Sequence, residues 1–126
     1  MAKIFLFHGK TVEDLKKMSL EEFSKMLTAR QRRSLKKGLT KEQKKLLESL
    51  RKKQKIVKTH VREMVILPEM IDKKLAVYNG KDWVILEIIP EMLGHKLGEF
   101  SHTRGRIFHS SPGVGATKSS KFTALK

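Results

Sequence analysis

The sequence predicts an α+β fold: a small three-stranded antiparallel sheet with N-terminal helices packed on it and an extended basic C-terminal tail. Three observations support this prediction. Helix-start signals and apolar residues at helical spacing fill the chain up to about residue 54. Short apolar, β-branched runs separated by turn residues follow between residues 61 and 89. Beyond Arg104 the apolar periodicity ends, and glycine, proline and serine take over.

Two hydroxyl residues mark the starts of predicted helices. Ser19 precedes Glu22 by three residues and Thr40 precedes Gln43 by the same interval, which is the spacing of a capping box. We therefore expect a short helix over residues 20–28 and a longer one over residues 41–54, each with an apolar face. Between them, residues 29–38 are expected to be partly helical and to end at a glycine suited to a left-handed C-cap.

Three strands are predicted in the second half of the chain. Residues 61–67 are β-branched and apolar, and residues 75–78 lead into Asn79-Gly80, the dipeptide most typical of a tight hairpin. Residues 83–89 are almost continuously apolar. This run predicts burial on both faces, with the helices on one side and residues 91–100 on the other. Trp83 is accordingly expected to be a core or hairpin residue before any base-stacking role.

With 126 residues, the chain is long enough for a single domain. We expect an N-terminal extension with a short helix, an α+β domain and an extended basic tail. Their predicted limits are residues 1–28, 29–104 and 105–126. Within the domain, basic helices are expected over residues 29–58, the sheet over 61–89 and a docking element over 90–104.

Positive charge is the dominant feature of the composition. The 28 Lys and Arg residues against 13 Asp and Glu give a formal charge of +15. Residues 29–62 alone carry 14 basic and 2 acidic residues, whereas residues 63–92 carry 3 and 6. This excess predicts a polyanionic partner such as folded RNA, bound through salt-dependent phosphate contacts. A merely solvated helix face is the alternative, but Glu42 and Glu48 offer little intrahelical pairing.

The composition also excludes several classes of function. Cysteine is absent, which removes disulfides, thiolate metal sites and cysteine nucleophiles. No apolar run approaches the roughly 18 residues of a membrane span, so we expect a cytoplasmic protein with no membrane partner.

No metal, cofactor or small-molecule substrate is expected, and the chain is not predicted to be an enzyme. His95, His102 and His109 recur every seven residues, but Gly98 and Gly105 interrupt any helix that would align them on a metal. These histidines fit RNA stacking or hydrogen bonding, or ordinary surface positions. The acidic residues are not paired with a nucleophile or with a second carboxylate at a defined spacing.

The glycine-rich residues 113–119 resemble a phosphate loop only superficially. Ala116 and Thr117 separate the last glycine from Lys118, whereas a Walker loop has its lysine directly after the glycine. We expect Lys118, Ser119 and Ser120 to contact phosphates and sugars instead, with a solvated tail as the alternative.

The docking element contains the residues that packing explains least. Gly94 and Gly98 lie four residues apart and are expected to shape the backbone, while Leu97 and Phe100 are expected to seat the element on the sheet. This arrangement leaves polar side chains to face RNA, namely His95, Lys96, Thr103 and Arg104.

Several uncommon motifs follow one another in the order typical of one family. Arg-Ser-Leu-Lys-Lys-Gly at 33–38 is followed by Ile-Leu-Pro-Glu-Met at 66–70 and by Ala-Val-Tyr-Asn-Gly at 76–80. Pro-Glu-Met-Leu-Gly-His-Lys-Leu-Gly-Glu-Phe at 90–100, with Thr103-Arg104 after it, completes the series. These motifs resemble universal ribosomal protein nineteen of the small subunit. The Ala-Arg-Gln-Arg-Arg entry, the N-terminal extension and the Pro-Gly-Val-Gly-Ala-Thr-Lys ending are similar to its archaeal and eukaryotic branch.

The resemblance implies a structural component of the small-subunit head that binds small-subunit rRNA and supports translation in the cytoplasm. It also implies ribosomal protein thirteen of the small subunit as a partner, and a C-terminal tail that reaches toward tRNA. A free basic nucleic-acid-binding protein of the chromatin type is the alternative, and a small RNA-processing enzyme is a third hypothesis. The rRNA contacts predicted from charge and resemblance are Arg30, Arg32, Arg33, Ser34, Lys36, Lys37, Arg62, Asn79, Lys81, His95, Lys96, Gly98, Thr103, Arg104, Arg106, Lys118, Ser119 and Ser120.

Overall fold

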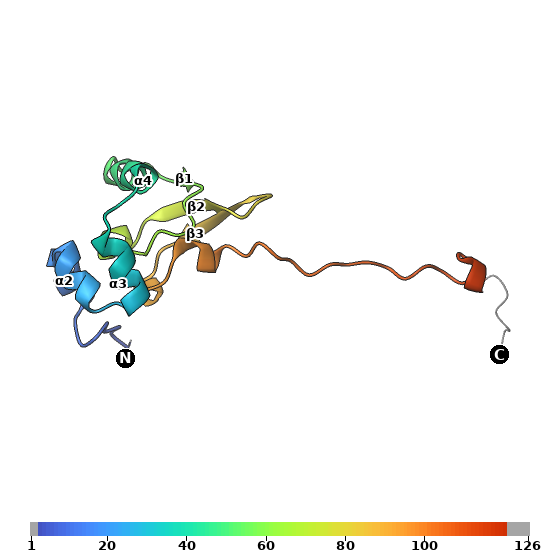
Figure 1. Cartoon of the computed structure of the whole chain (residues 1–126), viewed down its shortest axis with the longest axis horizontal. Helices are drawn as coiled ribbons and strands as arrows, with labels where there is room; N and C mark the ends of the chain where they lie inside the picture. Colours follow the sequence, from blue (N-terminus) through green and yellow to red (C-terminus); the bar gives the residue numbers. More distant parts are fainter. Residues whose placement is uncertain (1–2, 121–126) are drawn as a thin grey trace.

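The computed structural model describes residues 3–120 and confirms the predicted α+β class (Figure 1). The described elements are four α-helices, three strands and short 3-10 turns. The helices are α1 (Val12–Lys17), α2 (Leu20–Lys25), α3 (Ala29–Lys36) and α4 (Lys41–Arg51). The strands are β1 (Val57–Thr59), β2 (Lys74–Tyr78) and β3 (Trp83–Glu87), and the 3-10 turns are Pro68–Met70, Pro90–Met92, Leu97–Phe100 and Lys118–Ser120.

The predicted helix boundaries are confirmed where side chains cap the backbone. Ser19 Oγ accepts a hydrogen bond from the backbone N–H of Glu22, and Thr40 and Gln43 form a complete capping box. Gly38 follows α3 with φ of +93°, as expected for a left-handed C-cap. Helix α1 was not predicted, although Thr11 Oγ1 accepts a hydrogen bond from the backbone N–H of Asp14 there.

The capping box of α4 leads to a stability prediction. Thr40→Ala should lower the free energy of unfolding by about 1 kcal/mol, because the backbone N–H of Gln43 loses its acceptor at a solvent-exposed helix start. Urea unfolding of the full chain, followed by circular dichroism, measures the change. Thr40→Ser keeps the hydroxyl and should cost much less; equal losses for the two variants would contradict the capping explanation.

The sheet is mixed rather than antiparallel. Strand β2 lies at its centre, with β1 parallel to it and β3 antiparallel, so the predicted antiparallel topology is wrong for the β1–β2 pair. Parallel neighbours need a crossover, which residues 60–73 provide. The predicted hairpin between β2 and β3 is confirmed, and the backbone N–H of Asn79 donates to Asp82 O across its loop at 3.0 Å.

Residues 61–67 do not form the predicted sheet strand. They run extended beside the docking element: Val65 bridges Lys96, and the backbone N–H of Leu97 donates to Met64 O at 3.0 Å. Met64 and Ile66 are completely buried. The apolar run therefore reflects burial within the core rather than pairing in the sheet, and the short segment β1 takes the place beside β2.

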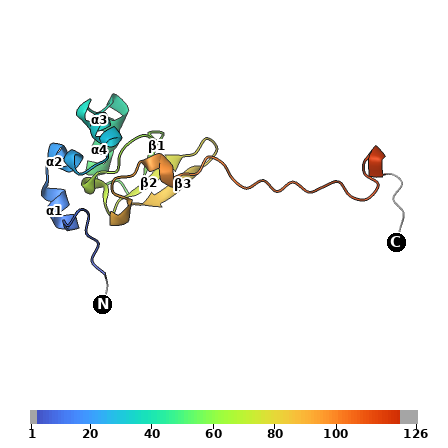
Figure 2. The same cartoon turned by 60° about the horizontal axis from the view of Figure 1, so that its bottom comes forward.

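One hydrophobic core joins the helices to the inner face of the sheet. Strands β2 and β3 contribute Leu75, Val77 and Leu86 to it, while α4 contributes leucines and α2 contributes Phe23. Helix α4 contacts β1, α1 contacts the turn Pro68–Met70, and α2 packs on α3. As Figures 1 and 2 show, the helices gather at one side of the molecule and the β2–β3 hairpin points away from them.

The outer face of the sheet is partly exposed along β3. Ile85 is 62% exposed and Trp83 is 37% exposed, so the prediction that residues 83–89 are buried on both faces is wrong. The docking element joins the inner core through the fully buried Leu97 and leaves the outer face free.

Residues 102–119 are exposed and carry no helix or strand before the turn Lys118–Ser120. Figure 1 shows this segment leading away from the body of the molecule. Residues 121–126 of the predicted tail lie outside the described residues. No helix among the described residues is long and apolar enough to span a membrane.

Candidate nucleic-acid interface

Helix α3 presents a dense group of cations to solvent. It buries Gln31 and Leu35, one helical turn apart, and these two residues define its inner face. The remaining polar and basic residues of α3 and its C-cap are exposed. We call them the helix patch; they are Arg30, Arg32, Arg33, Ser34, Lys36 and Lys37.

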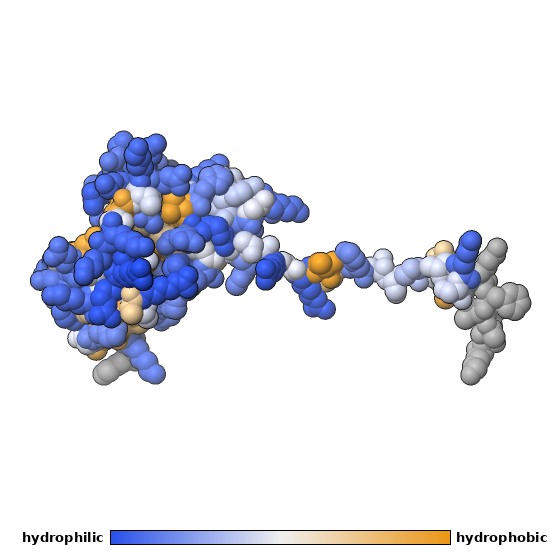
Figure 3. Space-filling model, in the orientation of Figure 1, coloured by the Kyte–Doolittle hydropathy of each residue, from blue (hydrophilic) through white to orange (hydrophobic). Residues whose placement is uncertain are grey.

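Almost none of the charge in this region is neutralised within the protein. Among the described residues, the single ion pair that involves a cation of residues 29–62 joins Arg51 to Glu69 at 3.3 Å. The near face of the body in Figure 3 is accordingly hydrophilic over most of its area, with small apolar patches. Cations that lack internal partners are free to bind an external polyanion.

Gln31 connects the helix patch to the docking element. Its Nε2 donates a hydrogen bond to Gly94 O, although the two residues are 63 positions apart. Gly94 has φ of +81°, and an added Cβ there would contact the Phe7 ring at 3.6 Å. Gln31 lies between two arginines of the patch, so the hydrogen bond places the start of the docking element beside it. The exposed His95 follows directly, with Nδ1 2.6 Å from Glu99 Oε2.

Arg62 fastens the other end of the docking element to the hairpin. Its Nη1 donates to Tyr78 O at 2.8 Å and to Ser101 Oγ at 3.0 Å. Its Nη2 donates to Gly98 O at 2.9 Å and to Ser101 O at 2.6 Å. We call this arrangement the Arg62 clamp. Arg62 was predicted as an rRNA contact, but the hydrogen bonds of both Nη atoms are internal.

Gly98 belongs to the same clamp. A Cβ on Gly98 would lie 3.0 Å from both Arg62 Cβ and Arg62 O, a tight spacing that would force Arg62 to shift by a few tenths of an ångström. The backbone N–H of Gly98 also donates to Arg62 O at 2.8 Å. The glycine therefore allows two segments of the protein to approach each other, which gives it a structural function besides the predicted RNA contact.

The clamp brings two groups of predicted contacts together. Ser101 is completely buried next to the end of β2, so the exposed Thr103 and Arg104 begin beside the hairpin loop. In that loop Asn79 Oδ1 accepts from the backbone N–H of Lys81 at 3.0 Å and closes the turn, while the Lys81 side chain is exposed. We call Asn79, Lys81, Thr103 and Arg104 the hairpin patch.

The remaining predicted contacts are not gathered into either patch. Lys96 is half-buried, and its backbone forms an isolated antiparallel β-bridge with that of Val65. Arg106 is exposed, and its guanidinium lies over the Phe108 ring at 5.4 Å. Lys118 and Ser119 are exposed at the far end of the described tail. The side chain of Ser120 lies outside the described structure.

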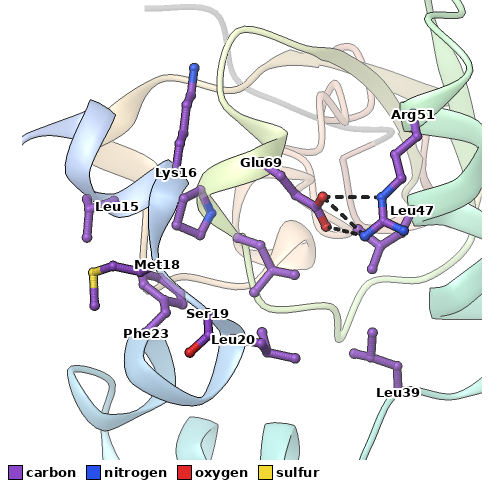
Figure 4. Close-up of a pocket in the computed structure, with 12 residues that line it drawn as sticks. Leu15, Lys16, Met18, Ser19, Leu20, Phe23, Leu39, Leu47, Arg51 and Glu69 are labelled. Atoms are coloured by element: carbon purple, nitrogen blue, oxygen red, sulfur yellow. Dashed lines mark hydrogen bonds and ion pairs between the residues drawn. The ribbon is translucent and has the colours of Figure 1, made fainter.

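A pocket between α1, α2 and α4 does not resemble an active site. Apolar side chains, most of them leucines, dominate its lining, and the Arg51–Glu69 ion pair crosses one side of it (Figure 4). Within residues 3–120, no three His, Asp or Glu side chains lie close enough together to hold a metal ion. The two cationic patches are an arrangement that suits phosphate binding.

Comparison with known proteins identifies the family. The model of the family described as Ribosomal protein S19 matches residues 33–109, which include α4, the sheet, the docking element and the hairpin patch. The chain belongs to the ribosomal protein S19 family. The S19 match starts within the helix patch and ends a few residues beyond Arg106.

A relative extends the S19 similarity to the N-terminal helices. The small ribosomal subunit protein uS19 of the archaeon Methanococcoides burtonii is 52% identical over 122 residues, which are 97% of this chain and 89% of the relative. This span includes α1 and α2, which precede the part matched by the S19 family. The resemblance inferred from the motifs, including its archaeal character, is confirmed.

Two connecting residues escaped the sequence analysis. Gln31 and Ser101 carry no charge and were assigned no contact, yet each joins the docking element to a distant part of the chain. Gln31 could have been found from its place one turn before Leu35 on the inner face of α3. The partners of Ser101 lie 24 and 39 residues away, and no local pattern indicates them.

Proposed function

We propose that this member of the S19 family is a structural component of the small-subunit head that binds small-subunit rRNA and so supports translation. The helix patch carries the proposal. Within eight helical residues and the C-cap it exposes five cations, none with an ion-pair partner among residues 3–120. Phosphate groups would neutralise this charge and release their condensed counterions, which favours binding.

The two patches would hold RNA as a prearranged pair. Gln31 fastens one end of the docking element to α3, and the Arg62 clamp fastens the other end to the hairpin. The cations of α3 and of the hairpin loop are thus carried by elements whose positions are set before RNA binds, which lowers the conformational entropy lost on binding. His95 and Lys96 lie in the docking element between the two patches and would add contacts there.

The tail supports further partners in this proposal. Ile107 and Phe108 are 72% and 85% exposed in a segment without a core of its own, and the exposed Arg106, Lys118 and Ser119 would supply polar groups for phosphates and sugars. Ser120 remains a contact predicted from the sequence. Together with the family resemblance, this exposure favours a tail that reaches tRNA. The resemblance alone favours ribosomal protein thirteen of the small subunit as a neighbour in the cytoplasmic ribosome.

Sedimentation tests the ribosomal assignment. The full chain, tagged and expressed in cells of its source, should sediment with small subunits on a sucrose gradient. Recovery in light fractions alone would overturn the proposal and favour a free basic nucleic-acid-binding protein of the chromatin type. Cleavage of labelled RNA by the purified chain, lost in His95→Ala and His102→Ala, would instead favour an RNA-processing enzyme.

The helix patch makes a quantitative prediction. Lys36→Ala and Lys37→Ala should each weaken binding to a small-subunit rRNA fragment and reduce the slope of log affinity against log salt by about one unit, because each removes one phosphate contact. Fluorescence anisotropy of the labelled fragment over a series of salt concentrations measures both effects.

A charge-matched variant controls this prediction. Lys17→Ala removes the same charge from the exposed end of α1, outside the helix patch, and should leave the slope nearly unchanged. An unchanged slope for both patch variants would show that their side chains remain in solvent in the complex.

A further inference from the structure

Three aromatic rings meet on the outer face of the sheet. Tyr78 and Trp83 stand directly opposite each other across β2 and β3, with ring centroids 5.1 Å apart. His60, just beyond β1, lies 4.8 Å from the Tyr78 ring and 4.9 Å from the Trp83 ring. We call these three residues the aromatic cluster. Ring contacts of this kind stabilise a hairpin, but this stabilisation does not explain why the rings are exposed to solvent.

The cluster is nevertheless open to solvent. His60 is exposed and Trp83 is 37% exposed, while Tyr78 between them is half-buried. The cluster is also continuous with the hairpin patch, since Asn79 directly follows Tyr78 and the Tyr78 carbonyl is held by the Arg62 clamp.

A lysine lies directly over one of the rings. Lys58 Nζ lies 5.6 Å from the centroid of the Trp83 ring, and the exposed Lys81 occupies the adjacent loop. Asp82 lies in the same loop, whereas Glu87 is at the far end of β3, paired in register with Lys74. A surface cation–π contact is weak, so Lys58 can exchange the ring for a phosphate without a large loss.

We propose that the aromatic cluster stacks an unpaired base of the RNA that the helix and hairpin patches bind, an inference that rests on the function proposed above. A ring beside a lysine suits a nucleotide, whose base stacks on the ring while its phosphate contacts the ammonium group. A base within a duplex has no free face to offer, so the partner is a loop, a bulge or a single strand. An apolar protein surface would offer no anion to the ammonium group of Lys58, which makes it the weaker candidate.

The chain contains a single tryptophan, so its intrinsic fluorescence reports on this site without labelling of the protein. Two RNA probes of mixed sequence would be used, one single-stranded and about ten nucleotides long, the other a duplex of the same length. Anisotropy of a dye on the RNA measures binding, and quenching of Trp83 measures stacking. We expect both probes to bind and the single strand alone to quench the tryptophan.

Variants separate stacking from general binding. Trp83→Ala should weaken single-strand binding about tenfold, in line with the loss of one stacked base, and leave duplex binding unchanged. Trp83→Phe retains a ring and should lose much less. Ile85→Ala is the matched control, because Ile85 lies on the same face of β3, is 62% exposed and carries no ring. The quenching of the wild-type chain needs no variant, so the test stands even where Trp83→Ala fails to fold.

The outcomes distinguish this inference from the function on which it rests. Binding of both probes without quenching by the single strand would overturn the stacking proposal and leave RNA binding intact. Binding of neither probe would overturn both. A loss for Ile85→Ala equal to that for Trp83→Ala would show that the face binds through apolar area in general, as a protein-docking surface does, and would also overturn base stacking.

Discussion

Arg62→Met should lower the free energy of unfolding by about 3 kcal/mol, one of the two largest effects expected for this chain. Methionine retains an apolar stem but removes the donors to Tyr78 O, Gly98 O and both oxygens of Ser101. Ser101 is completely buried, so water cannot easily replace the lost partners. Urea unfolding of the full chain at fixed ionic strength measures the change.

A second arginine provides the matched control. Arg51 is exposed and makes a surface ion pair with Glu69, so Arg51→Met removes the same charge and should cost less than about 1 kcal/mol. The loss of stability in Arg62→Lys should lie between those of Arg62→Met and Arg51→Met, because one ammonium group cannot donate to all four acceptors of the planar guanidinium. Equal effects of Arg62→Met and Arg51→Met would show that the clamp contributes little beyond its charge.

Loss of the clamp should also weaken RNA binding. Without Arg62, the end of β2 and Ser101 at the root of the tail are no longer held together, so the hairpin loop and the segment that leads to Arg104 can move apart. In folded protein below the unfolding transition, Arg62→Met should reduce affinity for the rRNA fragment more than Arg51→Met does. The comparison holds net charge constant.

Gly98→Val is the second substitution with a large expected effect and should destabilise the chain by about 3 kcal/mol. A Cβ would lie 3.0 Å from Arg62 O, so the two backbone segments must separate and the hydrogen bond from the Gly98 N–H to Arg62 O, now 2.8 Å, must lengthen. Gly98→Ala should produce a smaller change of the same sign. The same urea titration measures both variants.

Gly105→Val controls for the general effect of adding a side chain to a glycine. A Cβ at Gly105 meets nothing within 4 Å, so this variant should unfold like the wild type. The double variant Arg62→Met/Gly98→Val should lose less stability than the sum of the two single changes, because both disrupt the same contact. Full additivity would show that the two residues act independently, contrary to the clamp.

The sequence indicated correctly those features that depend on neighbours within a few residues. The starts of α2 and α4 follow from Ser19 and Thr40, whose hydroxyls cap backbone groups three residues ahead. The end of α3 follows from Gly38, since a positive φ favours glycine. The exposed cations of α3 were also correctly placed, because an excess of charge within one short segment cannot be buried.

Features that depend on distant partners were outside the reach of the sequence. An apolar run indicates burial but not the segment that pairs with it, so residues 61–67 were assigned to the sheet in place of β1, whose three residues carry little signal. For the same reason, the run from residue 83 onward did not reveal that one face of β3 stays uncovered and leaves Trp83 in solvent.

By itself, the sequence determined the family, the α+β class, the helix ends, the hairpin and the concentration of positive charge, all of which are local or compositional properties. Only the tertiary structure decided how these parts are joined. Arg62 and Gly98 were predicted to contact RNA, yet they meet each other across 36 residues and fasten the docking element to the hairpin. Their partners are set by packing of the whole chain, because a hydrogen bond between distant residues depends on where the fold places both.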